Sequence, residues 1–472
     1  MDNAADRVAQ AGIGARLDRL PRAWHLWRVV IVLSLGGAFE FYDLFFTGYV
    51  APGMVKAGMF GPESLGPLRF LVSLGLLGIG SFVFATFAGL FVGAMLLGSA
   101  ADRFGRRTVF IAALLWYSLA NLGLAFQGSG FGIDLWRFIS GIGLGIELVT
   151  IDTYIAELIP ARDRGRAFAL SAFITFSAVP LIALLAWLLV PEQIFGLDGW
   201  RIVVLIGSAG ALAAYYFQRA VPESPRWLAR HGRLGEADQI VTRIEAAIIR
   251  ETRLSLPLPA AIVEENSGKS GFAEIWSSAY RGRTIMLSVF HFFQTIGFYG
   301  FAAWVPSLLI AKGILITKSL EYSFIIAIAN PIGPLLGMLV ADRFERKWQI
   351  CAAAIGIAVF GLLFSAALDP VALIGLGVLV TLSNNWMSFA FHNYQAELFP
   401  TRIRARAVGF VYGWSRLSAA FAGLAIDYLL QASGVVSVFL FIGFAMLMVV
   451  VSIGGFGPKT RELGLEAISR KR

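Results

Sequence analysis

The sequence has few of the residues from which metal sites and disulfide frameworks are built. Its 472 residues include one cysteine, Cys351, and four histidines, with no His-x-x-x-His spacing. A single cysteine excludes a disulfide framework and any site with several cysteine ligands. The histidine pattern also speaks against a zinc centre. We therefore expect neither a metal site nor a cofactor.

Charge is also scarce, and apolar residues are abundant. Charged residues make up 15% of the chain and hydrophobic residues 57%, with a mean hydropathy of +0.73. This composition excludes a soluble globular protein. Apolar stretches long enough to cross roughly 30 Å of hydrocarbon recur along the chain. The net charge of +9 lies mainly in alternate loops, as positive-inside orientation requires, so we expect no nucleic-acid partner.

The N-terminus lacks the basic–apolar–small pattern of a cleavable signal peptide. Residues 12–28 alternate arginine with leucine and tryptophan. This pattern predicts that residues 1–27 form a cytosolic amphipathic segment lying against the bilayer.

The chain repeats itself at a distance of 240 residues. The stretch DRFGRR at 102–107 returns as DRFERK at 342–347, and YIAELIP at 154–160 returns as YQAELFP at 394–400. Two unrelated charge patterns in one register indicate a duplicated half. A duplicated, strongly apolar chain is typical of transporters whose two halves rock around a central site.

The apolar runs predict twelve transmembrane helices. They lie near 28–52, 78–101, 109–128, 132–156, 165–190, 200–220, 285–312, 321–341, 348–368, 371–397, 405–431 and 434–456. We expect an all-α polytopic membrane protein with two pseudo-symmetric six-helix bundles, residues 28–220 and 285–456. Residues 66–77 are expected to form a short outer segment.

The polar stretch 221–284 lies between the bundles and has the alanine, glutamate and arginine content of helices. It predicts a cytosolic helical linker. Arginine is dense in the connections on that same side and nearly absent from the opposite loops. Both termini, including the tail 457–472, are therefore expected in the cytosol.

Several motifs resemble the major facilitator superfamily. GSAADRFGRR at 98–107 is similar to its loop signature, and PESPRWL at 222–228 to the sugar-porter signature of the central loop. GARLDRLP at 14–21 and EFYD at 40–43 resemble the bacterial metabolite:proton symporters. Glu147 and Arg416 resemble positions in the organic-ion relatives. The resemblance implies the major facilitator fold and a transport function. Gln294 stands alone where sugar porters have paired glutamines, which argues against a sugar substrate.

Acidic residues inside the spans are candidates for proton coupling. Glu40 and Asp43 are three residues apart and share one face of the first span. A charged group at that depth costs at least ~2.5–3.5 kcal/mol, so it needs a polar cavity or a partner. By resemblance, Asp43 matches the proton-coupling aspartate of sugar porters and Arg137 its partner. Each acid could instead serve as a structural partner of a buried arginine.

Two further charges lie in the fourth and eleventh spans. Arg137 could anchor at the outer interface by snorkelling, whereas Glu147 is deeper and needs Arg137, Arg416 or a proton. Arg416 lies about a dozen residues from either end of its run, so it needs Asp43, Glu147 or a bound carboxylate as its anion. A permanent Arg416–Glu147 salt bridge is the structural alternative.

The remaining candidates are polar and aromatic residues of the second half and charged residues of the loops. The residues expected to contact substrate, besides Arg416, are Gln294, Tyr299, Asn330, Asn384, Asn385, Trp386, His392 and Trp414. The residues expected to form salt bridges that lock the outward-facing state are Asp102, Arg103, Arg106, Glu157, Arg164, Glu223, Arg226, Asp342, Arg343, Glu397 and Arg404.

These observations predict a secondary transporter in the bacterial cytoplasmic membrane. We expect a monomer that imports a small organic solute with protons, most simply a carboxylate-bearing metabolite. A sugar or polyol symporter is the alternative, and an efflux antiporter comes third. A membrane-embedded enzyme would need a catalytic constellation or nucleotide loop, and the sequence shows neither. A channel would have no reason for buried acid–base pairs.

Overall fold

The computed structural model describes residues 12–60, 78–97, 100–259, 272–340 and 344–460. The expected outer segment 66–77, the loop residues Asp342 and Arg343, and most of the C-terminal tail lie outside the described residues.

The first half consists of helices joined by short connections. They are α2 (Trp24–Lys56), α4 (Ile79–Leu97), α5 (Ala100–Phe104), α6 (Arg106–Ala125), α7 (Gly130–Leu158), α8 (Arg164–Phe176), α9 (Ala178–Leu189), α10 (Gly199–Gly207) and α11 (Gly210–Ala220). A one-turn helix, η2 (Ala161–Asp163), precedes α8. The antiparallel strands β1 (Gln193–Ile194) and β2 (Leu197–Asp198) form a hairpin between α9 and α10.

The second half repeats this arrangement. Its helices are α14 (Arg281–Ala302), α15 (Val305–Ala311), α16 (Ile316–Ala327), α17 (Ala329–Val340), α18 (Arg346–Ala366), α19 (Pro370–Glu397), α20 (Thr401–Val449) and the π-helical η4 (Val450–Gly455). Of the described residues, eleven helical stretches are long and apolar enough to cross a membrane. One of them, 406–455, bends at Gly434 (φ 76°) and holds two spans. The predicted twelve-span fold is confirmed.

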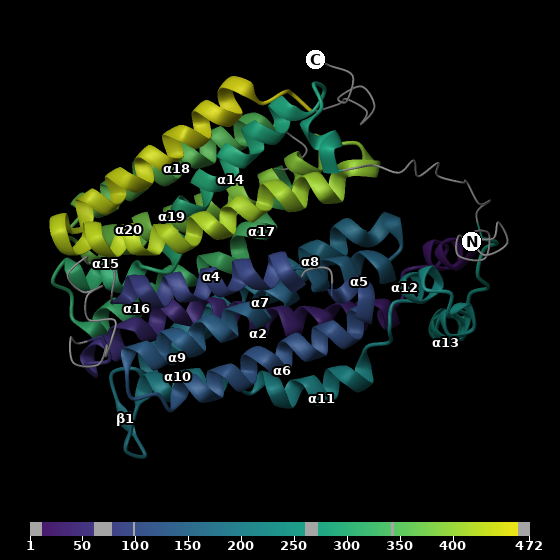
Figure 1. The fold of residues 1–472 in the computed structure, drawn as a ribbon, viewed down its shortest axis with the longest axis horizontal. Coiled ribbons are helices and arrows are strands. Elements are labelled where there is room, and N and C mark those ends of the chain that lie inside the picture. The colour runs from purple at the N-terminus through teal and green to yellow at the C-terminus, as the bar shows by residue number, and fades with distance from the viewer. Residues whose placement is uncertain (1–11, 61–77, 98–99, 260–271, 341–343, 461–472) are drawn as a thin grey trace.

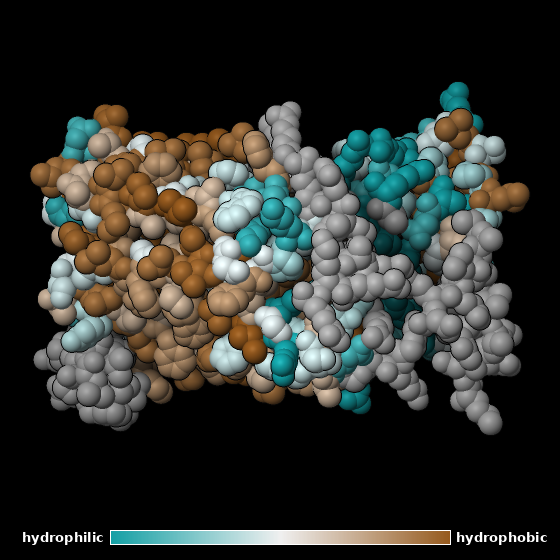
Figure 2. Space-filling model, turned by 90° about the horizontal axis from the view of Figure 1, so that it is seen from above, coloured by the Kyte–Doolittle hydropathy of each residue, from teal (hydrophilic) through white to brown (hydrophobic). Residues whose placement is uncertain are grey.

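The linker contains α12 (Pro225–Arg230), α13 (Leu234–Thr252) and η3 (Phe272–Trp276). Helix α13 lies at one end of the molecule, which we call the linker end (Figure 1). The β1–β2 hairpin lies at the opposite end, which we call the hairpin end (Figure 1). Figure 2 shows hydrophilic residues gathered towards the linker end and a largely hydrophobic surface over the spans.

Several helices begin at residues whose side chains cap the free backbone N–H groups. The Ser129 hydroxyl accepts from Gly132 N (3.2 Å) at the start of α7, and the Asp369 carboxylate accepts from Ala372 N (2.9 Å) at the start of α19. Pro370 then occupies the first helical position of α19, where its missing N–H costs nothing. Local sequence therefore fixes where these spans begin.

Glycines let α4 and α7 pack backbone against backbone. A Cβ atom at Gly89 would lie 2.2 Å from Phe138 O, and one at Gly141 would lie 2.4 Å from Thr86 O. The hydrophobic effect does not drive helices together in lipid, so small residues that allow close van der Waals packing stabilise such contacts. The close contact places Thr86 of α4 beside Arg137 of α7.

Several helices of the first half pack against helices of the second. Helix α4 packs along α20, and α8 and α9 pack along α17 and α16. Trp187 of α9 stacks on Phe324 of α16, with ring centroids 5.8 Å apart. The Asp427 carboxylate of α20 accepts a hydrogen bond from Gly80 N at the start of α4 (2.9 Å).

The sequence repeat reappears as repeated contacts. Arg106 binds Glu157 at 2.9 Å in the first half, and Arg346 binds Glu397 at 3.1 Å in the second. A second repeated contact is a donation from Arg164 Nε to Ile159 O (3.2 Å), matched by Arg404 Nε to Phe399 O (3.2 Å). Each residue and its counterpart differ by 240 positions, so the duplication extends to side-chain geometry.

The N-terminal segment packs against the linker. Residues 12–18 are helical, and the side chains of Leu17 and Leu20 are fully buried. Arg16 binds Glu245 of α13 at 2.7 Å, and Arg19 binds the same carboxylate at 2.6 Å. The linker therefore offers acidic partners for the arginines of the segment, and contact of the segment with a bilayer stays a prediction.

Candidate functional site

A buried ion pair joins the first and fourth spans. Arg137 Nη1 of α7 lies 2.6 Å from Asp43 Oδ1 of α2, and both side chains are fully buried. Arg137 also donates to the hydroxyls of Thr86 (2.8 Å) and Thr47 (2.7 Å). Ser140 donates to Asp43 Oδ2 at 2.9 Å. The pair is thus satisfied by hydrogen bonds on both sides, as a buried ion pair must be.

Aromatic rings pack against the guanidinium of the same pair. The guanidinium carbon of Arg137 lies 4.4 Å from the ring centroid of Phe46 and 5.7 Å from that of Phe82. The sequence left open that Arg137 snorkels to the outer interface; the structure instead buries it. Of the partners found here, sequence reasoning missed Thr47 and Thr86, because hydroxyl residues carry no distinguishing signal in an apolar run.

The other two acids of this half have different surroundings. Glu147 is fully buried, and neither of its carboxyl oxygens has a hydrogen-bond partner among the described residues. It lies against Gly36: a Cβ atom added to this glycine would be 3.5 Å from Glu147 Oε1. Glu40 is also buried, and its Oε1 has no partner among the described residues. Glu147 therefore contacts neither of the arginines that the sequence suggested for it.

Arg416 lies on α20 at the interface of the two halves. Its Nη1 is 3.3 Å from the hydroxyl of Tyr299 and its Nη2 is 3.4 Å from that of Tyr412, whose ring it also covers at 4.8 Å. Tyr299 in turn packs on Phe87 and Phe45 of the first half, with centroid distances of 4.6 and 6.4 Å.

Neither of the protein carboxylates that the sequence suggested for Arg416, Asp43 and Glu147, forms an ion pair with it. Among the described residues no carboxylate forms an ion pair with Arg416, and the predicted Arg416–Glu147 salt bridge is absent. The side chain of Arg416 is buried, and its described hydrogen-bond partners are the hydroxyls of Tyr299 and Tyr412.

The predicted amide residues line a small cavity between the halves. Asn330, Asn384 and Asn385 contribute to its wall together with Tyr49 of α2. Asn385 donates to Asn330 O at 3.2 Å. Neither amide atom of Asn384 has a partner among the described residues.

Three predicted substrate residues lie elsewhere. Trp386 donates its indole N–H to Gln349 of α18 (3.1 Å), and Trp414 packs edge-on against Phe410 at 6.4 Å. Gln294 donates to its neighbour Thr295 at 2.9 Å. None of the three is among the residues that line the cavity, and none of the contacts given above involves Arg416. Their positions within the spans were predicted, but the direction of each side chain depends on helix rotation.

Of two residues at equivalent positions of the repeat, the sequence singled out only one. Asp152 of α7 and His392 of α19 occupy equivalent positions, 240 residues apart, and both are exposed although each lies within a span. His392 had been predicted to contact substrate; its ring lies 6.0 Å from that of Tyr412. Asp152 could have been identified from the repeat, because it lies 240 residues before His392, a predicted site residue.

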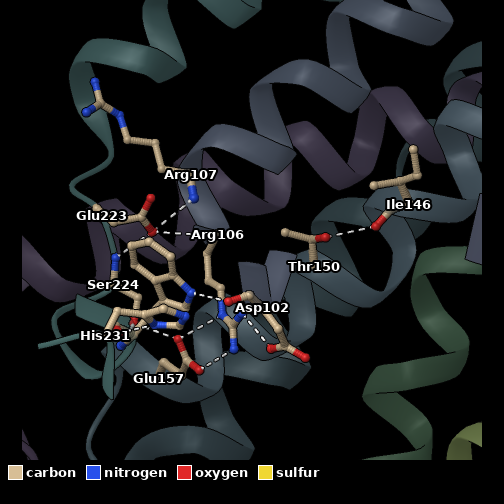
Figure 3. A network of polar contacts seen from close by, with 10 residues as sticks. Asp102, Arg106, Arg107, Ile146, Thr150, Glu157, Glu223, Ser224 and His231 are labelled. Atoms are coloured by element: carbon tan, nitrogen blue, oxygen red, sulfur yellow. Dashed lines mark hydrogen bonds and ion pairs between the residues drawn. The ribbon is translucent and has the colours of Figure 1, made fainter. Parts of the chain in front are cut away.

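The linker end carries a dense polar network (Figure 3). Arg106 binds Glu157 and also Asp102, at 2.7 Å from its Oδ1. Glu223 accepts from the backbone N–H groups of Arg106 (2.9 Å) and Arg107 (3.1 Å). The contacts of Glu223 join the first half to the linker, those of Arg106 with Glu157 and Asp102 lie within the first half, and none of them reaches the second half. A latch between the halves therefore stays a prediction for the opposite conformation.

The other predicted loop residues extend this network. Arg226 binds Asp18 of the N-terminal segment at 2.9 Å, and Arg164 lies 3.8 Å from the same carboxylate. Arg103 is exposed, with its guanidinium over the ring of Phe104. The charged loops thus hold the linker and the N-terminal segment in place.

Comparisons with known proteins agree with this architecture. The sequence model of the family described as "Sugar (and other) transporter" matches residues 29–471. The chain is 33% identical to the putative metabolite transport protein YyaJ of Bacillus subtilis, covering 94% of this chain and 95% of that protein. It is 29% identical to the niacin transporter NiaP of Acinetobacter baylyi, covering 96% and 99%.

The fold is shared with a solved structure. The partially occluded inward-open xylose transporter XylE of Escherichia coli superposes with a TM-score of 0.74 at 21% identity, covering 94% of this chain and 100% of that one. The comparisons identify a transporter and not an enzyme. The chain belongs to the sugar (and other) transporter family and is a multi-pass membrane transporter with the twelve-helix major facilitator fold.

Proposed function

We propose that this transporter imports a small carboxylate-bearing metabolite together with protons, by alternating access across the bacterial cytoplasmic membrane. The linker end then lies in the cytosol, in agreement with the arginine-rich loops there. Asp152 and His392 are exposed within their spans, which supports access from this end and an inward-facing conformation.

Arg416 is the observation that carries the carboxylate. A guanidinium buried at the interface of two moving halves, with no carboxylate in ion-pair contact among the described residues, lacks its natural anion. A carboxylate would meet it through paired, charge-assisted hydrogen bonds. The relative named as a niacin transporter carries a molecule of this kind.

Asp43 is the proposed proton carrier. As a carboxylate it is bound to Arg137 at 2.6 Å, and protonation would remove the charge that holds the pair. Glu147 is the second candidate, because a carboxylate with neither cation nor donor is very costly in an apolar interior and the protonated form is far cheaper. The monomeric state and the roles of the loop charges in gating belong to the same proposal.

The test is uptake into proteoliposomes under an inward proton gradient. We expect accumulation of small carboxylates such as nicotinate or benzoate, and none of xylose. Arg416→Lys keeps the charge but loses the planar fork, so carboxylate affinity should fall by about 1.5–3 kcal/mol. Arg416→Gln should weaken it further. Accumulation of xylose that does not depend on Arg416 would contradict the proposal.

A control tests whether Arg416 serves a buried acid of the first half. Arg416 and Glu147 form no ion pair, and Glu40 of α2 is another buried acid, with no hydrogen-bond partner for its Oε1 among the described residues, so the informative double variant is Arg416→Gln with Glu40→Gln. Full recovery of carboxylate affinity in that variant would make Arg416 a structural partner of Glu40.

A sugar or polyol symporter is the second candidate. The amide-lined cavity favours it, because neutral amides are suitable partners for hydroxyl groups. A sugar needs no cation, however, so this alternative leaves Arg416 unexplained. The xylose measurement above distinguishes the two.

A further inference from the structure

The cavity beside Arg416 has an unsatisfied amide in its wall. Asn384 of α19 is 3% exposed, and neither its Nδ2 nor its Oδ1 has a partner among the described residues. The Nδ2 of its neighbour Asn385 donates to Asn330 O, while the Oδ1 of Asn385 has no partner among the described residues. A buried polar group without a partner costs about 1–3 kcal/mol. Such a cost is unusual in a well-packed span and marks a place where a ligand belongs.

The cavity adjoins the Arg416 site. Phe298 lines the cavity, and the next residue, Tyr299, touches Arg416. On α2, Phe45 packs on Tyr299, and Tyr49 lines the cavity four residues later. Four residues on a helix advance by about 6 Å. The two sites are therefore separated by roughly one helical turn, with the cavity towards the hairpin end.

The lining sets the chemistry of the ligand. Besides the amides and the hydroxyl of Thr381, the cavity is bounded by aromatic and aliphatic side chains, and none of the described residues lining it is charged. An amide both donates and accepts, so it matches an uncharged group such as a hydroxyl, a carboxamide or a ring nitrogen. A second carboxylate would be buried there without a cation, which is strongly unfavourable.

We propose that Asn384 binds the uncharged polar end of a planar monocarboxylate whose carboxylate is held by Arg416. This inference rests on the function proposed above and specifies its substrate class. The rings of Phe45, Tyr299, Phe298 and Tyr49 would flank the body of the molecule, since aromatic side chains provide large apolar contact with defined geometry. The site selects against dicarboxylates and against monocarboxylates that lack a far polar group.

The test compares three probes that differ only at the far end: benzoate, 4-hydroxybenzoate and terephthalate. Their binding to the purified full-length transporter is measured by calorimetry. We expect 4-hydroxybenzoate to bind about five- to tenfold tighter than benzoate, the ratio that one well-placed hydrogen bond gives. Terephthalate should bind more weakly than either.

Asn384→Leu should bring the ratio of the 4-hydroxybenzoate and benzoate affinities close to one, because the partner of the hydroxyl group is lost. Because Asn384 makes no hydrogen bond among the described residues, the substitution breaks none there, and thermal unfolding checks that the fold persists. Asn393→Leu is the matched control, since that amide lies on the same helix and donates to Phe389 O (3.1 Å) away from the cavity.

The outcomes separate the two proposals. Equal binding of benzoate and 4-hydroxybenzoate in a protein whose affinity falls in Arg416→Gln overturns the role of Asn384 alone. A preference that survives Asn384→Leu, or tighter binding of terephthalate, overturns it too. Binding of none of the three probes, or binding unaffected by Arg416→Gln, overturns the carboxylate function itself. The comparison in the unmodified protein needs no variant to fold.

Discussion

At the scale of single residues, the Asp43–Arg137 pair should matter for folding as well as for transport. Arg137→Met would leave Asp43 fully buried without its cation, which typically costs about 3–5 kcal/mol. Asp43→Asn removes the charge that needs a partner, so the double variant Arg137→Met with Asp43→Asn should recover much of that loss. Thermal unfolding in detergent measures all three. A double variant no more stable than Arg137→Met would show that the arginine acts through packing on Phe46 and Phe82.

A second prediction at this scale separates proton coupling from substrate movement. Asp43→Asn should abolish accumulation driven by a proton gradient and leave solute exchange partly intact, because exchange requires binding and rocking but no net proton release. Uptake and counterflow in the same proteoliposomes measure the two activities. If Asp43→Asn still concentrates solute, Glu147 becomes the carrier, and Glu147→Gln should then lose accumulation.

The sequence could locate the buried charges, and the resemblance paired Asp43 with Arg137, but the surroundings of Arg416 and Glu147 were not predictable. Arg416 and Glu147 were identifiable because charge in an apolar run is costly wherever it lies. Their partners come from other helices: Tyr299 is 117 residues from Arg416. Which side chains meet depends on helix rotation and packing, and a single sequence carries no direct signal for either.

At the scale of elements, the N-terminal segment gives a prediction that depends on pH. Burial alone would raise the pKa of Glu245 on α13, but hydrogen bonds from Arg16 and Arg19 outweigh it and hold that pKa below its usual range. A lowered pKa in the folded state stabilises the docked segment above the unfolded value of about 4.3. This contribution is lost as the pH falls through the folded pKa.

Hydrogen exchange of residues 12–23 measures the docking. We expect protection at pH 7 that declines as the pH falls below about 4.3, and early loss of protection at pH 7 in Glu245→Gln. Glu236→Gln is the matched control, because that exposed carboxylate on the same helix binds Arg233 and not the N-terminal segment. Equal protection in Glu245→Gln and the control would show that Leu17 and Leu20 alone hold the segment.

The spans themselves were predictable because each must be apolar for about 20 residues to cross the bilayer. The docking of the N-terminal segment was not. Its alternation of arginine with leucine suits an acidic protein surface as well as a membrane surface, and only the position of Glu245 decides between them. Helix α20 is continuous in the structure, and the single residue Gly434 marks the boundary between the two spans that the apolar runs predicted there.

At the scale of the whole molecule, the repeat predicted two equivalent halves, and the structure repeats the Arg106–Glu157 contact as Arg346–Glu397 and that of Arg164 with Ile159 as Arg404 with Phe399. The conformational state was not predictable, because both states of an alternating-access transporter use the same helices and the same sequence. In the described state the halves are joined near the hairpin end, where Gly48 of α2 lies so close to Ala303 that an added Cβ would be 2.1 Å from its carbonyl oxygen.

Asp427 should act as a latch at that end. Its carboxylate, 4% exposed, crosses from α20 to accept the backbone N–H of Gly80 at the start of α4 (2.9 Å). There it also faces the positive end of the helix dipole. Opening the hairpin end must break this contact. Asp427→Ala removes a hydrogen bond to a charged group, worth about 1.5–3 kcal/mol, and so should shift the equilibrium towards the hairpin-open state by roughly tenfold or more.

Spin-label distances can measure this shift once the buried Cys351 is replaced by alanine. One label pair, at Glu192 and Leu368, reports on the hairpin end, and another, at Arg103 and Phe344, reports on the linker end; all four positions are exposed. In Asp427→Ala the first distance should lengthen and the second shorten, because alternating access couples the two ends. Asp369→Ala is the control, since that carboxylate caps α19 within the second half and joins nothing across the interface. Unchanged distances in Asp427→Ala, or equal shifts in both variants, would mean that packing alone, as at Gly48 and Ala303, keeps the hairpin end closed.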